Sequence, residues 1–378
     1  MTRDELLATL PQSAFAFRGY NTTNLGRSRE LLTHPAYGAI VRKFLMRGSA
    51  ICSEAVGRQV DLAERVEQER ETDLQSYTDA ISLIVSMELA QLELLREFFG
   101  IDYQSSNLMY GYSLGEIAAV VAGGVIEMEG PLSVLSKLAD DAVELASDVT
   151  LGVLFSRGPA LSLEIVQSEC LRVNHTGQGV IGVSAYLSPN SLLLLGQADT
   201  LDRLKARLDE VLDHRLYLRK NKESWPPMHT PIVWNRNIPN RAAVMMHSMQ
   251  GGFNRTHPDV FSLVTGRVEY TDHTTRDILC RWIDQPQRLW DAVYETLKRG
   301  IETVVHVGPA PNLIPATLGR LQVDVEGQTR GSIGMRALSN IIRRPWLSTL
   351  LPSRTALLRA PHIKQFNLED WLLDQKIG

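Results

Sequence analysis

Apolar residues along this chain fall into patterns typical of buried strands and amphipathic helices. The run Ala14 to Phe17 is closed by Gly19 and Asn21, which predicts a buried strand ending in a loop. Between about 29 and 70 the pattern is helical and increasingly charged, as on a solvated helix face. From 79 to 99, apolar positions recur at helical spacing and predict a long helix whose single apolar stripe packs on a sheet.

The next segments predict a strand, a sharp turn and a helix in direct succession. A short strand is expected at 107–110, a tight turn at 111–115, and a helix rich in Ala and Val at 116–122. Longer helices return between 226 and 316, together with an apolar strand at 303–307 that Gly308 and Pro309 close.

The middle of the chain alternates differently. Strands are predicted at 152–156, 180–187, 191–196 and 214–219, and helices at 159–172 and 199–212. The order βαββαβ describes a small ferredoxin-like unit. We therefore expect a large α/β domain from 1–149 and 223–330, an inserted ferredoxin-like subdomain at 150–222, and a C-terminal extension of short helices at 331–378, a mildly basic segment interrupted by prolines.

Composition narrows the class of protein. The 378 residues are 44% hydrophobic and 22% charged, as expected for a globular protein. A net charge of -4 gives no general attraction to a nucleic-acid backbone or an anionic membrane. No run of 18 apolar residues occurs, the N-terminus has no apolar signal core, and the three cysteines are widely separated. We expect a cytoplasmic protein without nucleic-acid or membrane partners.

The strongest chemical signal is Gly111-Tyr112-Ser113-Leu114-Gly115, which lies between the predicted strand and helix. A serine on such an elbow needs glycines where side chains would clash. The helix N-terminus behind it places backbone N–H groups near a developing oxyanion. Ser113 is therefore the candidate nucleophile.

A serine nucleophile needs a base, and two of the nine histidines are candidates. A hydrolase-like chain order favours His306, which lies within the apolar strand Val304 to Val307. His229 follows Pro226, Pro227 and Met228, in an extended segment stiffened by proline. The residues alone leave both open.

The elbow resembles that of the malonyl-CoA:acyl carrier protein transacylases and the related acyltransferase domains of polyketide synthases. Their Gly-His-Ser-Leu-Gly-Glu motif corresponds to Gly111 to Glu116, and their N-terminal Phe-Pro-Gly-Gln-Gly loop to Phe17 to Asn21. Weaker similarities lie at Thr78 to Ala80 and Val307 to Pro309, so the resemblance covers roughly residues 12 to 320. It implies an α/β-hydrolase-like large domain with a parallel sheet and a nucleophile elbow, plus the ferredoxin-like insertion.

The resemblance also implies a mechanism. His229 matches the family's histidine and would take the proton of Ser113, which attacks a thioester carbonyl. The backbone N–H groups of Leu114 and Tyr20 would form the oxyanion hole. Backbone carbonyls near Val264 and Thr265 would orient the histidine, so no acidic triad member is required. The acyl group would pass to the phosphopantetheine thiol of an acyl carrier protein.

Departures from the family concern the acyl group. Malonyl-specific members hold the free carboxylate with an arginine, and the corresponding position here is Leu138. Tyr112 replaces the histidine before the nucleophile, Tyr20 replaces the loop glutamine, and Met228 adjoins the base. Leu138, Tyr112 and Met228 are therefore expected to shape a pocket that favours a non-carboxylated acyl group over malonyl.

The expected function is acyl transfer from acyl-CoA or a carrier protein to an acyl carrier protein, in fatty-acid or polyketide-like synthesis. The alternatives are a thioester hydrolase on the same scaffold, a plain esterase that uses His306, and a catalytically idle interaction module. The histidines and cysteines show no ligand spacing, so no metal or organic cofactor is expected. Basic residues that precede His229 are candidates for binding coenzyme A or the carrier: Arg215, Arg219, Lys220 and Lys222.

Overall fold

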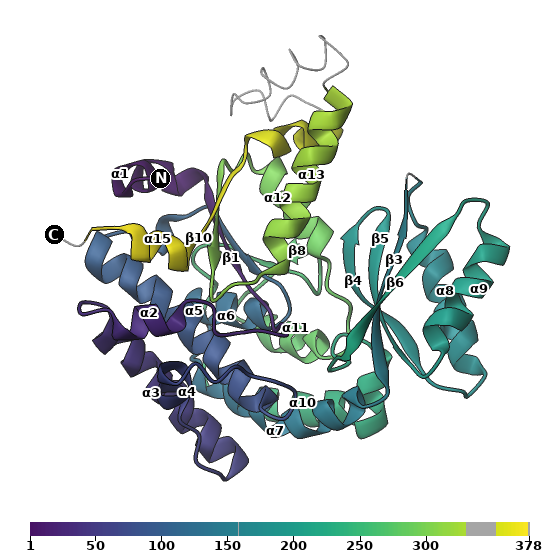
Figure 1. Cartoon of the computed structure of the whole chain (residues 1–378), viewed down its shortest axis with the longest axis horizontal. Coiled ribbons are helices and arrows are strands. Elements are labelled where there is room, and N and C mark those ends of the chain that lie inside the picture. The colour runs from purple at the N-terminus through teal and green to yellow at the C-terminus, as the bar shows by residue number, and fades with distance from the viewer. Residues whose placement is uncertain (158, 330–352, 377–378) are drawn as a thin grey trace.

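The computed structural model describes residues 1–157, 159–329 and 353–376, which form two α/β units side by side (Figure 1). The larger unit is built on a six-stranded sheet of order β10-β9-β1-β2-β7-β8, in which every pair is parallel except β7 with β8. Its strands are β1 (Ser13–Phe17), β2 (Leu108–Gly111), β7 (Val260–Ser262), β8 (Arg267–Val268), β9 (Thr303–Val307) and β10 (Lys364–Asn367).

Helices cover both faces of this sheet, which is why its central strands are buried throughout and mostly apolar. In β1, Phe15 and Phe17 point into the core under one helical layer, while Ala14 and Ala16 join the core on the opposite face. The helices of the large unit are α1 (Arg3–Thr9), α2 (Ser28–Thr33), α3 (Gly38–Val56), α4 (Leu62–Glu67), α5 (Tyr77–Phe99), α6 (Leu114–Ala122), α7 (Glu129–Ala146), α10 (Ile238–His247), α11 (Thr275–Trp282), α12 (Leu289–Lys298), α13 (Leu313–Thr329) and α15 (Leu368–Asp374).

The helix predicted at 79–99 is α5, and its surroundings differ from the expectation. A single apolar stripe was predicted, yet α5 is buried nearly all round, including the polar side chains of Ser82, Glu88 and Gln91. The reason is that α3, α6 and α7 pack against α5 in addition to the sheet. The helix is therefore the centre of its layer.

The smaller unit has the predicted order βαββαβ. It consists of β3 (Val149–Ser156), α8 (Leu163–His175), β4 (Ile181–Ser188), β5 (Ser191–Gln197), α9 (Thr200–Val211) and β6 (Leu216–Ser224), with sheet order β4-β5-β3-β6. One face of this antiparallel sheet packs on α8 and α9, and the other face contributes Ala185 and Leu193 to the core shared with α12. Strand β4 thus lies against the large unit.

Two parts of the large unit differ from the predicted pattern. The strands β7 and β8 lie in a region where only helices and one later strand were expected. Of the expected C-terminal extension, 331–352 and 377–378 lie outside the described residues, and 353–376 contains β10, which pairs in parallel with β9. The last described segment therefore completes the large sheet rather than forming helices alone.

Candidate active site

Ser113 lies on a sharp elbow between the end of β2 and the start of α6. Its backbone has φ +54° and ψ −118°, a conformation that is strained for a residue with a side chain. A Cβ atom added at Gly111 would lie 2.0 Å from the carbonyl carbon of Gly115, and one added at Gly115 would lie 2.3 Å from the carbonyl oxygen of Phe17. The two glycines are therefore required by close backbone approach.

His229 lies in hydrogen-bond contact with this serine. Its Nε2 is 2.7 Å from Ser113 Oγ, and its Nδ1 is 2.6 Å from the carbonyl oxygen of Trp282. Because a carbonyl oxygen only accepts, Nδ1 carries the ring proton and Nε2 is left to accept the proton of the serine. The geometry is that of a nucleophile with its general base.

The surroundings of His229 keep the imidazole neutral. The residue has φ +66°, and its backbone N–H donates to the carbonyl oxygen of Ile283 at 2.8 Å. Burial lowers the pKa of His229 to about 4, partly opposed by the hydrogen bond to the Trp282 carbonyl. At neutral pH the ring is therefore in the state that accepts a proton.

Trp282 is a residue that the sequence analysis missed. Besides its carbonyl contact, its indole Nε1–H donates to the carbonyl oxygen of Ser113 at 3.0 Å, and its ring meets that of His229 edge to face at 4.8 Å. One side chain thus contacts both Ser113 and His229, which together form the Ser–His dyad. A tryptophan at a helix end carries no motif, and a backbone acceptor has no side-chain signature.

The orienting carbonyl was predicted near Val264 and Thr265, and this prediction is wrong. The backbone N–H groups of both residues donate to Ser262 Oγ, in the turn that joins β7 to β8. The histidine is held from α11 instead, through Trp282.

Two backbone N–H groups near Ser113 are free to bind an oxyanion. Leu114 is the first residue of α6, so its N–H has no partner within the helix. Within the described part of the chain, neither this N–H nor that of Tyr20 has a hydrogen-bond acceptor. The loop that carries Tyr20 passes close to the elbow, because a Cβ atom added at Gly19 would lie 3.3 Å from Ser113 Cβ.

Buried Arg18 holds that loop in place. Its guanidinium donates to the carbonyl oxygens of Pro309 and Thr23 and to Asn24 Oδ1, while its backbone N–H donates to Glu88 Oε1 at 2.8 Å. Burial lowers the pKa of Arg18 to about 10, and the charge of Glu88 opposes this shift. The side chain therefore remains a cation at neutral pH.

Ser113 opens into a narrow apolar cavity of about 20 Å³. Leu138 and Met228 line it, and no charged side chain is among the described residues that line it. Tyr112 does not line it, because its ring packs into the core on the opposite side of the elbow. The lining residues are Tyr20, Tyr77, Ile81, Ser113, Leu114, Leu135, Leu138, Ala139, Ala142, Met228 and Trp282.

The other candidate base lies elsewhere. His306 is a buried residue of β9, and its Nε2 is 2.9 Å from Gln365 Oε1 on the neighbouring strand β10. Burial lowers its pKa to about 4. The contacts of His306 are those of a core histidine, not of a base for Ser113.

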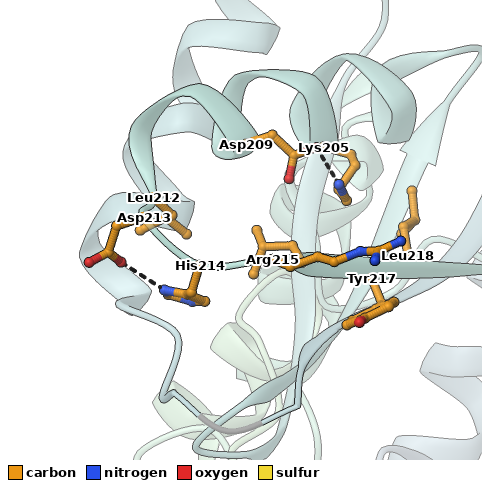
Figure 2. A pocket seen from close by; sticks show the side chains of 9 residues that line it. Lys205, Asp209, Leu212, Asp213, His214, Arg215, Tyr217 and Leu218 are labelled. Atoms are coloured by element: carbon orange, nitrogen blue, oxygen red, sulfur yellow. Dashed lines mark hydrogen bonds and ion pairs between the residues drawn. The ribbon is translucent and has the colours of Figure 1, made fainter.

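The basic residues before His229 belong to the small unit and do not line the Ser113 cavity. Arg219, Lys220 and Lys222 are exposed on the edge strand β6, where Lys220 pairs with Asp202 of α9. Arg215 precedes this strand and lines an open hollow of about 640 Å³, where its guanidinium lies over the ring of Tyr217 (Figure 2).

The described residues give two further results. They contain no group of three or more His, Cys, Asp or Glu side chains arranged to hold a metal ion. They also include no helix that is both long and apolar enough to span a bilayer.

Comparison with known proteins supports the resemblance seen in the sequence. No family model matches the chain. Polyketide synthase GfsA of Streptomyces halstedii is 22% identical over 302 residues, which is 79% of this chain and 4% of the synthase. The highly reducing polyketide synthase otaA of Aspergillus carbonarius is 28% identical over 199 residues, 52% of this chain and 7% of the synthase. The chain thus spans only a small part of these relatives.

Solved structures show the fold. FabD of Acinetobacter baumannii superposes with a TM-score of 0.64 at 17% identity, covering 96% of this chain and 98% of FabD. MCAT of Streptococcus pneumoniae gives 0.65 at 21% identity, covering 82% of this chain and 92% of MCAT. A type II polyketide acyl-carrier protein in complex with its malonyl-transacylase gives 0.63 at 20%, covering 81% and 91%. The α/β fold class and the resemblance to malonyl-CoA:acyl carrier protein transacylases are confirmed.

Proposed function

We propose that this protein is an acyltransferase that moves an acyl group between thioester carriers through a covalent acyl-Ser113 intermediate. The observation that carries this proposal is the 2.7 Å contact between Ser113 Oγ and His229 Nε2 on a nucleophile elbow. The similarity to polyketide synthases and to transacylase structures supports the same reaction class.

The reaction follows from the protonation states. As Ser113 Oγ attacks the thioester carbonyl, its proton passes to His229 Nε2, and the N–H groups of Leu114 and Tyr20 receive the oxyanion. Collapse breaks the C–S bond, and the departing thiolate takes the proton from His229. A second thiol then loses its proton to His229 and attacks the ester carbonyl. The C–O bond to Ser113 breaks, the new thioester leaves, and Ser113 Oγ takes the proton back from His229.

The cavity supports a non-carboxylated acyl group. A malonyl carboxylate placed among Leu135, Leu138 and Met228 would lose water without gaining a charged partner. The charge-assisted hydrogen bonds that an arginine would provide are worth about 1.5–3 kcal/mol. We therefore propose an apolar acyl group without a carboxylate.

The proposed acceptor is an acyl carrier protein, as in the carrier protein complex found among the similar structures. The phosphopantetheine arm would reach Ser113 past Tyr20 and Trp225, whose rings are 5.5 Å apart. Arg215 and the basic residues of β6 remain proposed contacts for coenzyme A phosphates or the acidic carrier. The pathway would be fatty-acid or polyketide-like synthesis.

The test is the intact mass of the protein after incubation with a panel of acyl-CoAs, malonyl-CoA among them. Wild type is expected to gain one acyl mass, and Ser113→Ala is expected to gain none. His229→Ala should slow acylation strongly, whereas His306→Ala should not. Release of free coenzyme A without a mass gain would indicate a hydrolase, and neither change with any donor would indicate a non-catalytic module.

A further inference from the structure

Gln287 is a buried polar residue that the mechanism above does not use. It lies between α11 and α12 and has no exposed surface. Its side-chain Oε1 accepts the backbone N–H of Ser113 at 3.2 Å, and its Nε2 is 3.5 Å from His229 Nδ1. One side chain therefore lies against both members of the dyad.

The backbone of Gln287 is fixed by the small unit. Its N–H donates to the carbonyl oxygen of Ser184, and its carbonyl oxygen accepts the N–H of Tyr186, both at 2.8 Å. These bonds add Gln287 to β4 as a parallel bridge opposite Ala185. Ser184 Oγ also donates to the carbonyl oxygen of Met228, next to the base. Strand β4 therefore sets the position of both dyad residues.

The orientation of the Gln287 carboxamide follows from its neighbours. The Ser113 N–H is a donor and must face Oε1, so the NH2 group faces His229. The Nδ1 proton of His229 is already donated to the Trp282 carbonyl. The positive end of the NH2 dipole thus lies beside the imidazole ring, and it disfavours a second proton on that ring.

We propose that Gln287 is a positioning residue, whose carboxamide oxygen holds the strained Ser113 backbone against His229 and whose NH2 group disfavours the imidazolium. This inference rests on the proposed function of Ser113. It requires that Ser113 keep φ near +54°, a conformation that costs about 1–3 kcal/mol unless its surroundings stabilise it. A buried acceptor for the Ser113 N–H supplies such stabilisation.

The ionisable groups around His229 determine how its protonation depends on pH. Burial lowers its pKa, and the hydrogen bond to Trp282 is the opposing cause. Tyr20 and Tyr77 line the cavity beside Ser113, and burial raises the pKa of both phenols, so they are neutral. On α6, α11 and the segment between α11 and α12, the other ionisable groups are Glu116, Arg276, Asp277, Cys280, Arg281, Asp284 and Arg288.

The experiment measures the reactivity of Ser113 with a fluorophosphonate, which needs no knowledge of the acyl group. The serine oxygen attacks phosphorus, fluoride leaves, and the rate is read by intact mass between pH 4 and 8. Gln287→Met removes the acceptor with little change in volume, whereas Gln287→Glu keeps an acceptor for the Ser113 N–H and places a carboxylate beside His229. Gln365→Met is the matched control, since it removes a hydrogen-bonding glutamine from β10 that contacts His306.

We expect Gln287→Met to react about tenfold more slowly than wild type at all pH values, and Gln365→Met to react at the wild-type rate. At pH 8, Gln287→Glu should react at most of the wild-type rate. As the pH is lowered, its rate should fall at a pH at least one unit higher than the wild-type rate does, because a carboxylate favours the imidazolium. Thermal unfolding midpoints show that each variant is folded at the assay temperature. If Gln287→Met misfolds, the pH profile of Gln287→Glu decides alone.

Wild-type rates with unchanged pH profiles in the folded variants would overturn the inference. So would a wild-type protein whose Ser113 does not react with the fluorophosphonate. If Ser113 reacts but no acyl thioester labels it, the acyltransferase proposal fails while the role of Gln287 is still measured.

Discussion

No charged side chain is among the described residues that line the cavity beside Ser113, which gives a prediction about substrate choice under the proposed function. Leu138 lies on α7, is buried, and lines the cavity together with Leu135, Ala139 and Ala142 from the same helix. Leu138→Arg extends the side chain and places a guanidinium in a cavity that has no charged lining residue. The substitution should therefore redirect the enzyme from apolar acyl groups towards malonyl.

The magnitude follows from two opposing effects. A charge-assisted hydrogen bond from arginine to the malonyl carboxylate is worth about 1.5–3 kcal/mol, so the preference for malonyl over propionyl should rise roughly 10- to 150-fold. Without substrate the buried guanidinium lacks a partner, and the free energy of unfolding should fall by several kcal/mol. The variant should be less stable and more selective for malonyl.

The assay is a competition between equimolar malonyl-CoA and propionyl-CoA, with the two acyl-enzyme masses measured in one spectrum at early times. Leu138→Met is the control, because it lengthens the side chain without adding charge and should leave the ratio near that of wild type. If Leu138→Arg is acylated with the wild-type ratio, the role assigned to position 138 is wrong. A wild type that takes malonyl as readily as propionyl would refute the same reasoning.

Three further outcomes follow from buried groups. Acylation of wild type should hold its rate through pH 6.5 and fall by half near pH 4, since burial lowers the pKa of His229 to about 4; a pH-jump measurement with a midpoint near 6.5 would contradict this. Burial also lowers the pKa of His306 to about 4, so below pH 6.5 the unfolded state binds more protons than the folded state. Between pH 6.5 and 4, each of the two histidines therefore lowers the free energy of unfolding by up to about 1.4 kcal/mol per unit fall in pH. His306→Gln should reduce that slope, measured by urea unfolding at several pH values, without slowing acylation, and an unchanged slope would count against the burial argument. Arg18→Met should lower the free energy of unfolding by about 3–5 kcal/mol because its buried partners lose their donor, whereas the exposed Arg29→Met should change it by less than about 1 kcal/mol; equal effects in urea titrations would exclude the anchoring role.

Sequence patterns were sufficient to predict the structural features that form between residues close together along the chain. The glycines around Ser113, the apolar strand before it and the Ala-rich helix after it predict the elbow, because backbone clashes within five residues decide that geometry. The order of strands and helices in the small unit was likewise readable from apolar periodicity. The strands β7, β8 and β10 were not predicted, because they are short and have little pattern of their own.

Contacts between distant segments required the tertiary structure. The residues alone left both His229 and His306 open, and the family resemblance favoured His229. Packing places His229 Nε2 2.7 Å from Ser113 Oγ and His306 against Gln365. The carbonyl that orients His229 comes from Trp282, not from the turn at Val264, because any residue carries a carbonyl and sequence does not encode which one points inward.

The same limit applies to Gln287 and Tyr112. Tyr112 adjoins the nucleophile in sequence but faces the opposite core, since the elbow turns successive side chains to different sides. Gln287 is 174 positions from Ser113 and reaches it only because β4 of the small unit holds its backbone. The sequence by itself indicated Ser113 as the candidate nucleophile and predicted the local fold around it, whereas the side chains that contact Ser113 were decided by tertiary packing.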